Sequence, residues 1–250
     1  MVQRMVKSAC ENSEVALFGP KVGPIRAIRK EDSVRVTKLE HACILVEESG
    51  RKCFIDPGKF TTPITEAALV DLVAITHEHD DHWTTEQLAR LAERSPGLTV
   101  VTTAATAERI RDAGIEGLRN VIVGKPGANY EIGEFKISCF GGKHAEIHSS
   151  IPIIDNLGVV INGKLAYGGD AYDLPPLPVE ALAVPKYGPW MRMAESMDYL
   201  AQVRPKRAFG VHEMLLALPG KQLATARFSE IAESVGAKYL DLAPYDSFEL

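Results

Sequence analysis

The sequence predicts a single domain of the α/β class, and three observations support this prediction. Short runs rich in β-branched residues alternate with segments of helical periodicity in both halves of the chain. The apolar run LVDLVAIT (69–76) is nearly continuous, which is typical of a strand buried on both faces. No low-complexity linker separates the halves, so we expect residues 33–250 to fold as one domain.

The first half is expected to contain five strands and two helices. The strand-like runs are VRVTKL (34–39), ACILVEE (42–48), KCFID (52–56), LVDLVAIT (69–76) and LTVVTT (98–103). Turn residues such as Ser49-Gly50 separate them. Helical periodicity predicts helices at 85–94 and 104–112, on either side of the last of these strands.

The second half is expected to begin with two hairpins. YEIGEFKISCF (130–140) turns at Gly133, and NLGVVINGKLAYGGD (156–170) turns at Asn162-Gly163, a dipeptide that strongly favours a two-residue hairpin turn. The elements expected after them are strands LAVP (182–185), RAFGVH (207–212) and KYLDLA (238–243), with helices near 191–203 and 221–235.

Composition limits the classes of function. The chain of 250 residues is 46% hydrophobic and 24% charged, which is ordinary for a soluble globular protein. Its net charge of -5 argues against a nucleic-acid partner, and no apolar run approaches the length of a membrane span. The four cysteines form no CxxC pair, which favours reduced thiols in the cytoplasm.

Residues 1–32 show little periodic pattern, so we expect an N-terminal extension that packs loosely or adds an edge strand. The extension contains basic residues but no continuous apolar stretch, and we do not interpret it as a secretory signal.

The stretch THEHDDHW (76–83) concentrates three of the seven histidines and two aspartates. His77 and His79 follow a predicted strand, and residues two apart in extended chain point the same way, so both imidazoles can face one point. Asp81 and His82 follow where the chain turns toward a helix, and can face a second point nearby. Imidazole nitrogen and carboxylate oxygen are ligands for zinc, manganese and iron, so the stretch predicts a metal site.

The other four histidines each begin or end a strand-like run: His41, His144, His148 and His212. Asp170 follows LAYGG, where two glycines allow the backbone to approach another group closely. Any one of these histidines could be a buried structural residue. Together they indicate that strand ends bring further ligands to the metal site.

The H-x-H-x-D-H motif of residues 77–82 resembles that of the metallo-β-lactamase superfamily, and the resemblance covers about residues 33–250. Three later motifs match in order, at His144, Gly169-Asp170 and His212. The opening LEHACILVE…FIDPG resembles the branch of predicted metal-dependent hydrolases that includes ascorbate-6-phosphate lactonases. The resemblance implies an αβ/βα sandwich, in which two mixed sheets lie face to face with helices on both outer faces.

The resemblance also implies two divalent metal ions, Zn²⁺ first, with Mn²⁺ or Fe²⁺ as alternatives. The implied ligands are His77, His79 and His144 for one metal, Asp81, His82 and His212 for the second, and Asp170 bridging both. Two departures from the branch are visible. Many relatives have a histidine just before the Gly-Asp, where this chain reads Tyr167-Gly168, and residues 1–32 have no counterpart.

Three further residues have roles to assign. Relatives place the third ligand directly after the strand, which favours His144 and leaves His148 to touch substrate or the outer shell. His41 either orients a ligand, donates to substrate or is a buried structural residue. Asp56 is expected to support the site from beneath. The candidate catalytic residues are Asp81, Asp170, His148 and His41.

The resemblance implies a hydrolase of a small-molecule lactone, ester, amide or phosphodiester. Two cations roughly 3.5–4 Å apart lower the pKa of a shared water toward about 7, and the resulting hydroxide attacks a carbonyl carbon or phosphorus. Asp81 or a metal-bound water could pass a proton to the leaving group.

Side chains near the motif ends could shape substrate choice. Arg192 and Lys143 could meet an anionic group on the substrate, although a solvated charge is the more ordinary reading. The apolar candidates either line the pocket or pack, with Trp190 the preferred pocket residue: Trp83, Tyr172, Tyr187, Trp190 and Met191.

Two other functions compete with the hydrolase. An RNA-processing nuclease shares the same ligands, but the acidic balance and the lack of a basic Gly-rich arm argue against it. A non-catalytic protein that binds a metal or another ligand would be expected to have lost one of the metal-binding residues, and the intact set argues against this alternative. The sequence does not define the oligomeric state, and a homo-oligomer is compatible with it.

Overall fold

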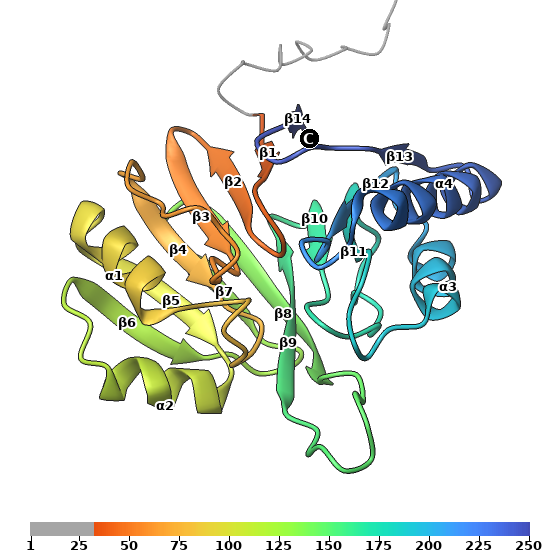
Figure 1. Cartoon of the computed structure of the whole chain (residues 1–250). Coiled ribbons are helices and arrows are strands. Elements are labelled where there is room, and N and C mark those ends of the chain that lie inside the picture. Colours follow the sequence, from red (N-terminus) through yellow and green to blue (C-terminus); the bar gives the residue numbers. More distant parts are fainter. Residues whose placement is uncertain (1–32) are drawn as a thin grey trace, which may run out of the picture.

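The computed structural model describes residues 33–250 and consists of two seven-stranded sheets (Figure 1). The first sheet contains, in spatial order, β14 (Ser247–Glu249), β1 (Arg35–Lys38), β2 (Ile44–Glu48), β3 (Arg51–Ile55), β4 (Val70–Ala74), β5 (Leu98–Thr102) and β6 (Leu118–Val123). The second contains β13 (Lys238–Leu240), β12 (Arg207–Val211), β11 (Ala181–Pro185), β10 (Leu165–Tyr167), β9 (Asp155–Ile161), β8 (Phe135–Lys143) and β7 (Asn129–Ile132).

Both sheets are mixed. In the first, β14 to β3 pair antiparallel and β3 to β6 pair parallel. In the second, β7 to β10 pair antiparallel and β10 to β13 pair parallel. Parallel strands need crossover segments, and four helices supply most of them. They are α1 (Thr85–Arg94), α2 (Ala104–Asp112), α3 (Met193–Val203) and α4 (Leu218–Ser234).

The helices lie on the outer faces of the two sheets, so the αβ/βα sandwich expected from the sequence is confirmed (Figure 1). Leu88 and Leu91 of α1 pack with Val73 and Val100 against the first sheet. On the second sheet, α3 and α4 cover residues of β9 to β12. Helix α1 begins where the Thr84 hydroxyl accepts a hydrogen bond from the Gln87 N–H, which satisfies one of its free amide donors.

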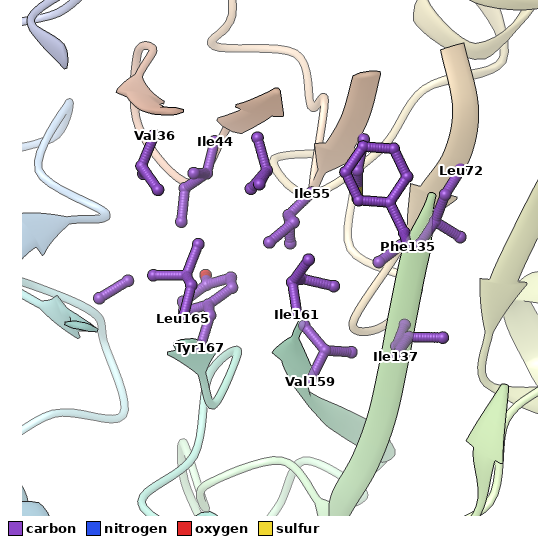
Figure 2. Close-up of a cluster of buried hydrophobic side chains, with 14 of the residues drawn as sticks. Val36, Ile44, Ile55, Leu72, Phe135, Ile137, Val159, Ile161, Leu165 and Tyr167 are labelled. Carbon is purple, nitrogen blue, oxygen red and sulfur yellow. The ribbon is translucent and has the colours of Figure 1, made fainter. Parts of the chain in front are cut away.

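The main core lies between the sheets and consists largely of β-branched and aliphatic side chains (Figure 2). Val36, Ile44 and Ile55 of the first sheet face Ile161 and Leu165 of the second. Each such side chain contributes about 1.5–3 kcal/mol when fully buried, so this layer fixes how the two sheets sit. A fixed sandwich is needed because both sheets supply residues to the same site.

The strand and helix predictions are confirmed with shifts of a few residues at the ends. Two strands were not predicted, the edge strand β6 and the short β14. The sequence of β6, LRNVIV, places Arg119 and Asn120 mid-strand, and both are exposed. The predicted extension at 1–32 lies outside the described residues. Between residues 33 and 250, no helix combines the length and apolar character that a membrane crossing requires.

Candidate metal centre

The loop between β4 and α1 carries the histidine-rich stretch, and Thr76 anchors it. The Thr76 N–H and hydroxyl donate to the two carboxylate oxygens of Asp56, both at 2.7 Å. Further along, the His82 and Trp83 N–H groups both donate to the His79 carbonyl, which turns the chain toward α1. Gly58 lies against this turn, and a Cβ there would be 1.8 Å from the Asp81 carbonyl oxygen. The local fold therefore needs glycine at position 58.

A first group of possible metal ligands consists of His77, His79, His144 and Asp170, whose ligand atoms lie within 4.8 Å of one another. His77 Nε2 is 3.0 Å from His79 Nδ1, and His144 Nε2 is 3.4 Å from Asp170 Oδ2. His77 and His79 follow β4 of the first sheet, whereas His144 follows β8 and Asp170 follows β10 of the second, so the two sheets meet at this group. The family resemblance implies the same three histidines as ligands of one metal.

A second group consists of His82, Asp170 and His212. His82 Nε2 is 3.3 Å from Asp170 Oδ1, and His212 Nε2 is 3.3 Å from Asp170 Oδ2. Asp81 lies beside this group, with Oδ2 3.4 Å from His212 Nε2 and 3.1 Å from His41 Nε2. Asp170 belongs to both groups, as a bridging carboxylate would.

Four histidines direct Nε2 into the site because Nδ1 already donates a hydrogen bond elsewhere. Nδ1 of His144 and His212 donates to backbone carbonyls, those of Ala145 and Tyr187. Nδ1 of His82 donates to Asp56 Oδ2 at 2.7 Å. His77 Nδ1 lies 3.0 Å from the Thr76 hydroxyl, whose hydrogen goes to Asp56, so His77 is the donor. In a neutral imidazole, Nε2 then carries the lone pair that can bind a metal.

The buried ligand atoms fit a cation. Four of them make no hydrogen bond within the described part of the chain, namely Nε2 of His82, His144 and His212, and Oδ1 of Asp170. Each unsatisfied buried polar atom costs about 1–3 kcal/mol, so four at one point need a shared partner. Three imidazole nitrogens and a carboxylate oxygen are a donor set that divalent transition metals accept.

The protonation states of the candidate ligands differ. Burial alone would lower the pKa of His82 and His212, but the Asp170 carboxylate raises that of His82 well above its usual value and that of His212 to about 9, so a cation would displace their Nε2 protons. Burial holds the pKa of His77 well below its usual value, and burial together with His144 lowers that of His79, so both stay neutral. Burial alone would raise the pKa of Asp170, but the facing imidazoles of His82 and His212 hold it well below its usual value. Neutral imidazole and ionised carboxylate are the forms that bind metal.

His41 and Asp56 lie behind the ligands, where both are fully buried. Burial lowers the pKa of His41 to about 4. Its Nδ1 accepts the Met214 N–H, so Nε2 carries the proton and donates to Asp81 at 3.1 Å. His41 therefore fixes Asp81, and Asp56 fixes His82. Outer hydrogen bonds of this kind orient metal ligands.

Asn156 positions Asp170 and was not identified from the sequence. Its side-chain amide donates to the Gly168 carbonyl at 2.8 Å, and its Oδ1 accepts the Asp170 N–H at 3.2 Å. Gly169 has φ +64, and a Cβ there would lie 2.3 Å from Asn156 Oδ1. Only glycine fits this approach. An asparagine at the start of a predicted strand gives no signal in the sequence, because its partners are 12 and 14 residues away.

The other candidate residues are placed differently. His148 is exposed, and its Nδ1 accepts the Ser150 N–H at 3.1 Å, so it organises its own loop. Lys143 forms an exposed ion pair with Asp155. Trp83 packs in the core against α1. Trp190 is buried in the site, where its indole N–H donates to Asp170 Oδ2 at 2.8 Å.

Most of the remaining candidates for substrate contact line one cavity beside the metal centre. Tyr172, Met191 and Arg192 line a cavity of about 610 Å³ beside Trp190 and His148. This cavity lies next to the ligands, because the ring centroids of Trp190 and His144 are 5.9 Å apart. Tyr187 contributes its backbone carbonyl to the site through the hydrogen bond from His212.

Comparisons with known proteins identify the family of the chain. The model of the beta-lactamase superfamily domain matches residues 35–212. Protein Rv0786c of Mycobacterium tuberculosis is 30% identical over 203 residues, which cover 79% of this chain and 92% of that protein. A UPF0173 metal-dependent hydrolase of Carboxydothermus hydrogenoformans is 28% identical over 200 residues, covering 72% of this chain and 84% of that protein.

A solved structure, Igni18, a metallo hydrolase of the archaeon Ignicoccus hospitalis, has the same fold. It superposes with a TM-score of 0.67 at 17% identity, over 87% of this chain and 98% of that one. The chain therefore belongs to the beta-lactamase superfamily, and one of its relatives is named a metal-dependent hydrolase.

Proposed function

We propose that the protein hydrolyses a small-molecule lactone, ester, amide or phosphodiester with two divalent metal ions, Zn²⁺ in the first place. The observation that carries the proposal is the convergence around Asp170, the carboxylate common to both groups, of four buried ligand atoms that make no hydrogen bond within residues 33–250. The residues that would hold the metals are His77, His79 and His144 for one, Asp81, His82 and His212 for the other, and Asp170 for both.

Two bound cations would supply hydroxide at neutral pH and an electrophile for the substrate oxygen. The chain's own residues would position the ligands and transfer protons. Asp81 is the more open carboxylate, with 18% of its side chain exposed against 4% for Asp170. We therefore assign to Asp81 the transfer of a proton, taken from the attacking water, to the leaving group. His41 holds Asp81 in place from the buried side.

One surface cation bears on the choice of substrate. Arg192 lines the 610 Å³ cavity and is the cation we assign to an anionic substrate group, since Lys143 is paired with Asp155.

We place the reaction in the cytoplasm. The described cysteines, Cys43, Cys53 and Cys139, are buried and unpaired, as expected in a reducing compartment.

The proposal is tested by metal content and activity together. Protein purified without chelator or added metal is expected to contain about two equivalents of zinc, manganese or iron per chain by elemental analysis. The same preparation is expected to hydrolyse a member of a panel of lactones, esters, amides and phosphodiesters, and to lose that activity with a chelator. Failure to take up metal on reconstitution would reject the mechanism, although the fold would stand.

A further inference from the structure

The loop between β8 and β9, residues 144–154, carries four isoleucines that the fold leaves partly exposed. Ile151 is 45% and Ile153 52% exposed, and Ile147 and Ile154 are half-buried. Figure 1 shows this loop projecting away from the ends of β8 and β9. Single exposed apolar side chains are ordinary, but several gathered together on one surface indicate a binding site.

These side chains enclose a cavity of about 200 Å³ that opens from the metal centre. We call it the isoleucine cavity, and its apolar lining is Ala145, Ile147, Ile151, Pro152, Ile153 and Ile154. Its remaining lining residues are His79 and His144, whose ring centroids are 4.9 Å apart. The apolar wall therefore begins directly at two residues of the first ligand group.

Hydrogen bonds hold the loop in this shape. At its base, the His144 N–H donates to the Ile154 carbonyl at 3.0 Å, and the Ala145 N–H donates to the Asp170 carbonyl at 2.8 Å. At its tip, the Ile151 N–H donates to the His148 carbonyl at 2.8 Å. The cavity is thus formed before a ligand arrives, as is usual for small-molecule sites.

The size and chemistry of the isoleucine cavity define what it can take. Its volume is below the roughly 300–1,000 Å³ typical of sites that enclose a whole ligand, so it fits one arm of a substrate. No Asp, Glu, Lys or Arg lines it, and an unpaired charge would be costly to bury there. Charged residues, Glu146, Arg192 and Glu195, line the neighbouring cavity of about 610 Å³, which shares only Ala145 and Ile147 with this one.

We propose that the isoleucine cavity binds a short alkyl or aryl arm of the substrate while the reacting group lies at the metal ligands. The inference rests on the proposed function, because it takes the reacting group to be bound at His79 and His144. It narrows the substrate to a molecule with an apolar substituent next to its hydrolysed bond. An ionised substituent at that position is excluded.

Binding of a homologous series to zinc-loaded protein tests the inference without requiring turnover. Acetohydroxamate, butyrohydroxamate and hexanohydroxamate share a metal-chelating head and differ in the alkyl arm. Titration calorimetry is expected to show affinity rising about fourfold per added methylene, which corresponds to about 0.8 kcal/mol, until the cavity is full. The fourfold steps would come from the arm, since the head is constant.

Variants of the loop test whether its isoleucines produce the gain in affinity with chain length. In the double variant Ile151→Asn, Ile153→Asn, acetohydroxamate binding is expected to persist, whereas the advantage of hexanohydroxamate falls at least tenfold. Leu223→Asn is the matched control, because Leu223 is 55% exposed and lies on α4, away from this loop. It is expected to keep the full dependence on chain length. Both variants change exposed positions, and their melting temperatures are expected to match the wild type.

The possible outcomes distinguish failure of this inference from failure of the proposed function. If acetohydroxamate binds but longer arms bring no gain, the isoleucine cavity is not an arm site and the metal centre stands. If no hydroxamate binds and no zinc is retained, the proposed function fails and the inference with it. If the isoleucine variant dissociates a wild-type oligomer in size-exclusion chromatography and keeps the chain-length gain, the isoleucines form an interface between copies, which overturns the inference.

Discussion

The carboxylate of Asp170 has three imidazole nitrogens within 3.4 Å, those of His82, His144 and His212, and the indole N–H of Trp190 at 2.8 Å. All of these groups except the indole are candidate ligands. A change of Asp170 that keeps its shape and removes its charge therefore tests the bridge without disturbing the packing around it.

We expect Asp170→Asn to bind fewer than two metal equivalents and to lose at least about 100-fold in turnover, because even outer partners of a metal ligand are worth about 10–100-fold. Elemental analysis and initial rates measure both effects. Asp173→Asn, three residues on and exposed, is the matched control and is expected to leave both unchanged. Full metal content in Asp170→Asn would show that the carboxylate does not bridge.

Trp190 gives a second prediction at the residue scale. Trp190→Phe keeps an aromatic ring but removes the N–H that donates to Asp170. A hydrogen bond to a charged group contributes about 1.5–3 kcal/mol, so metal affinity is expected to fall about 10–100-fold. A competition titration with a chromophoric chelator measures this loss. An unchanged affinity would mean that the indole serves packing alone.

Sequence could predict the ligand types at this scale, but not the contacts that orient them. His77, His79 and His82 were visible because they lie within six residues after a strand. The contacts of Asp170 with Asn156 and Trp190 join residues 14 and 20 apart, and that of Asp56 with His82 joins residues 26 apart. No local periodicity encodes such pairs, because turns and sheet order create them.

At the scale of elements, a buried ion pair joins the two sheets beside the metal centre. Lys38 ends β1 of the first sheet and Glu213 follows β12 of the second, with 2.5 Å between Nζ and Oε1 and side-chain exposures of 1% and 5%. Glu213 directly follows His212, whose N–H donates to the His41 carbonyl at 2.9 Å. The ion pair therefore holds the two sheets together next to His212, a candidate ligand, and His41, which positions Asp81.

Breaking this pair is expected to be costly. Lys38→Met leaves a buried, unpaired carboxylate, so the free energy of unfolding is expected to fall by about 3–5 kcal/mol. Lys59→Met removes an exposed pair with Asp80 and is expected to cost less than about 1 kcal/mol. Urea denaturation compares the two. Equal losses in both variants would mean that burial of the Lys38–Glu213 pair adds nothing.

Element prediction succeeded where local signals were strong. The hairpin at Asn162-Gly163 was found because turn residues act over a few positions, and α1 was found because helical periodicity is visible within ten residues. Strand β14 was missed, since three residues carry no periodicity and its strand identity depends on pairing with β1, more than 200 residues earlier.

At the scale of the whole molecule, candidate ligands come from both sheets, so metal binding and folding are coupled. Metal that binds only the folded chain stabilises it by about 2.7 kcal/mol at a concentration 100 times its dissociation constant. For a chain of this size, about 1 kcal/mol shifts the melting temperature by about 2–4 °C. Removal of metal by a chelator is therefore expected to lower it by about 5–10 °C.

Thermal denaturation before and after added zinc checks this coupling. The wild type is expected to recover its melting temperature, and Asp170→Asn to recover only part of it. If the chelator has no effect on protein that contained metal, the metal lies outside the folded framework and the assigned ligands are wrong. The two-sheet architecture itself followed from a family resemblance, because local patterns do not specify which strands share a sheet.

The pairing of β14 with β1 has a consequence for the order of assembly. At about 5–20 residues per second, synthesis separates Lys38 from Ser247 by about 10–40 s. During that interval the outer edge of β1 has no partner strand from β14, and a strand edge with free amides can pair with other chains. The growing chain therefore passes through a period in which β1, the first strand of residues 33–250, is available to a chaperone or a neighbouring nascent chain.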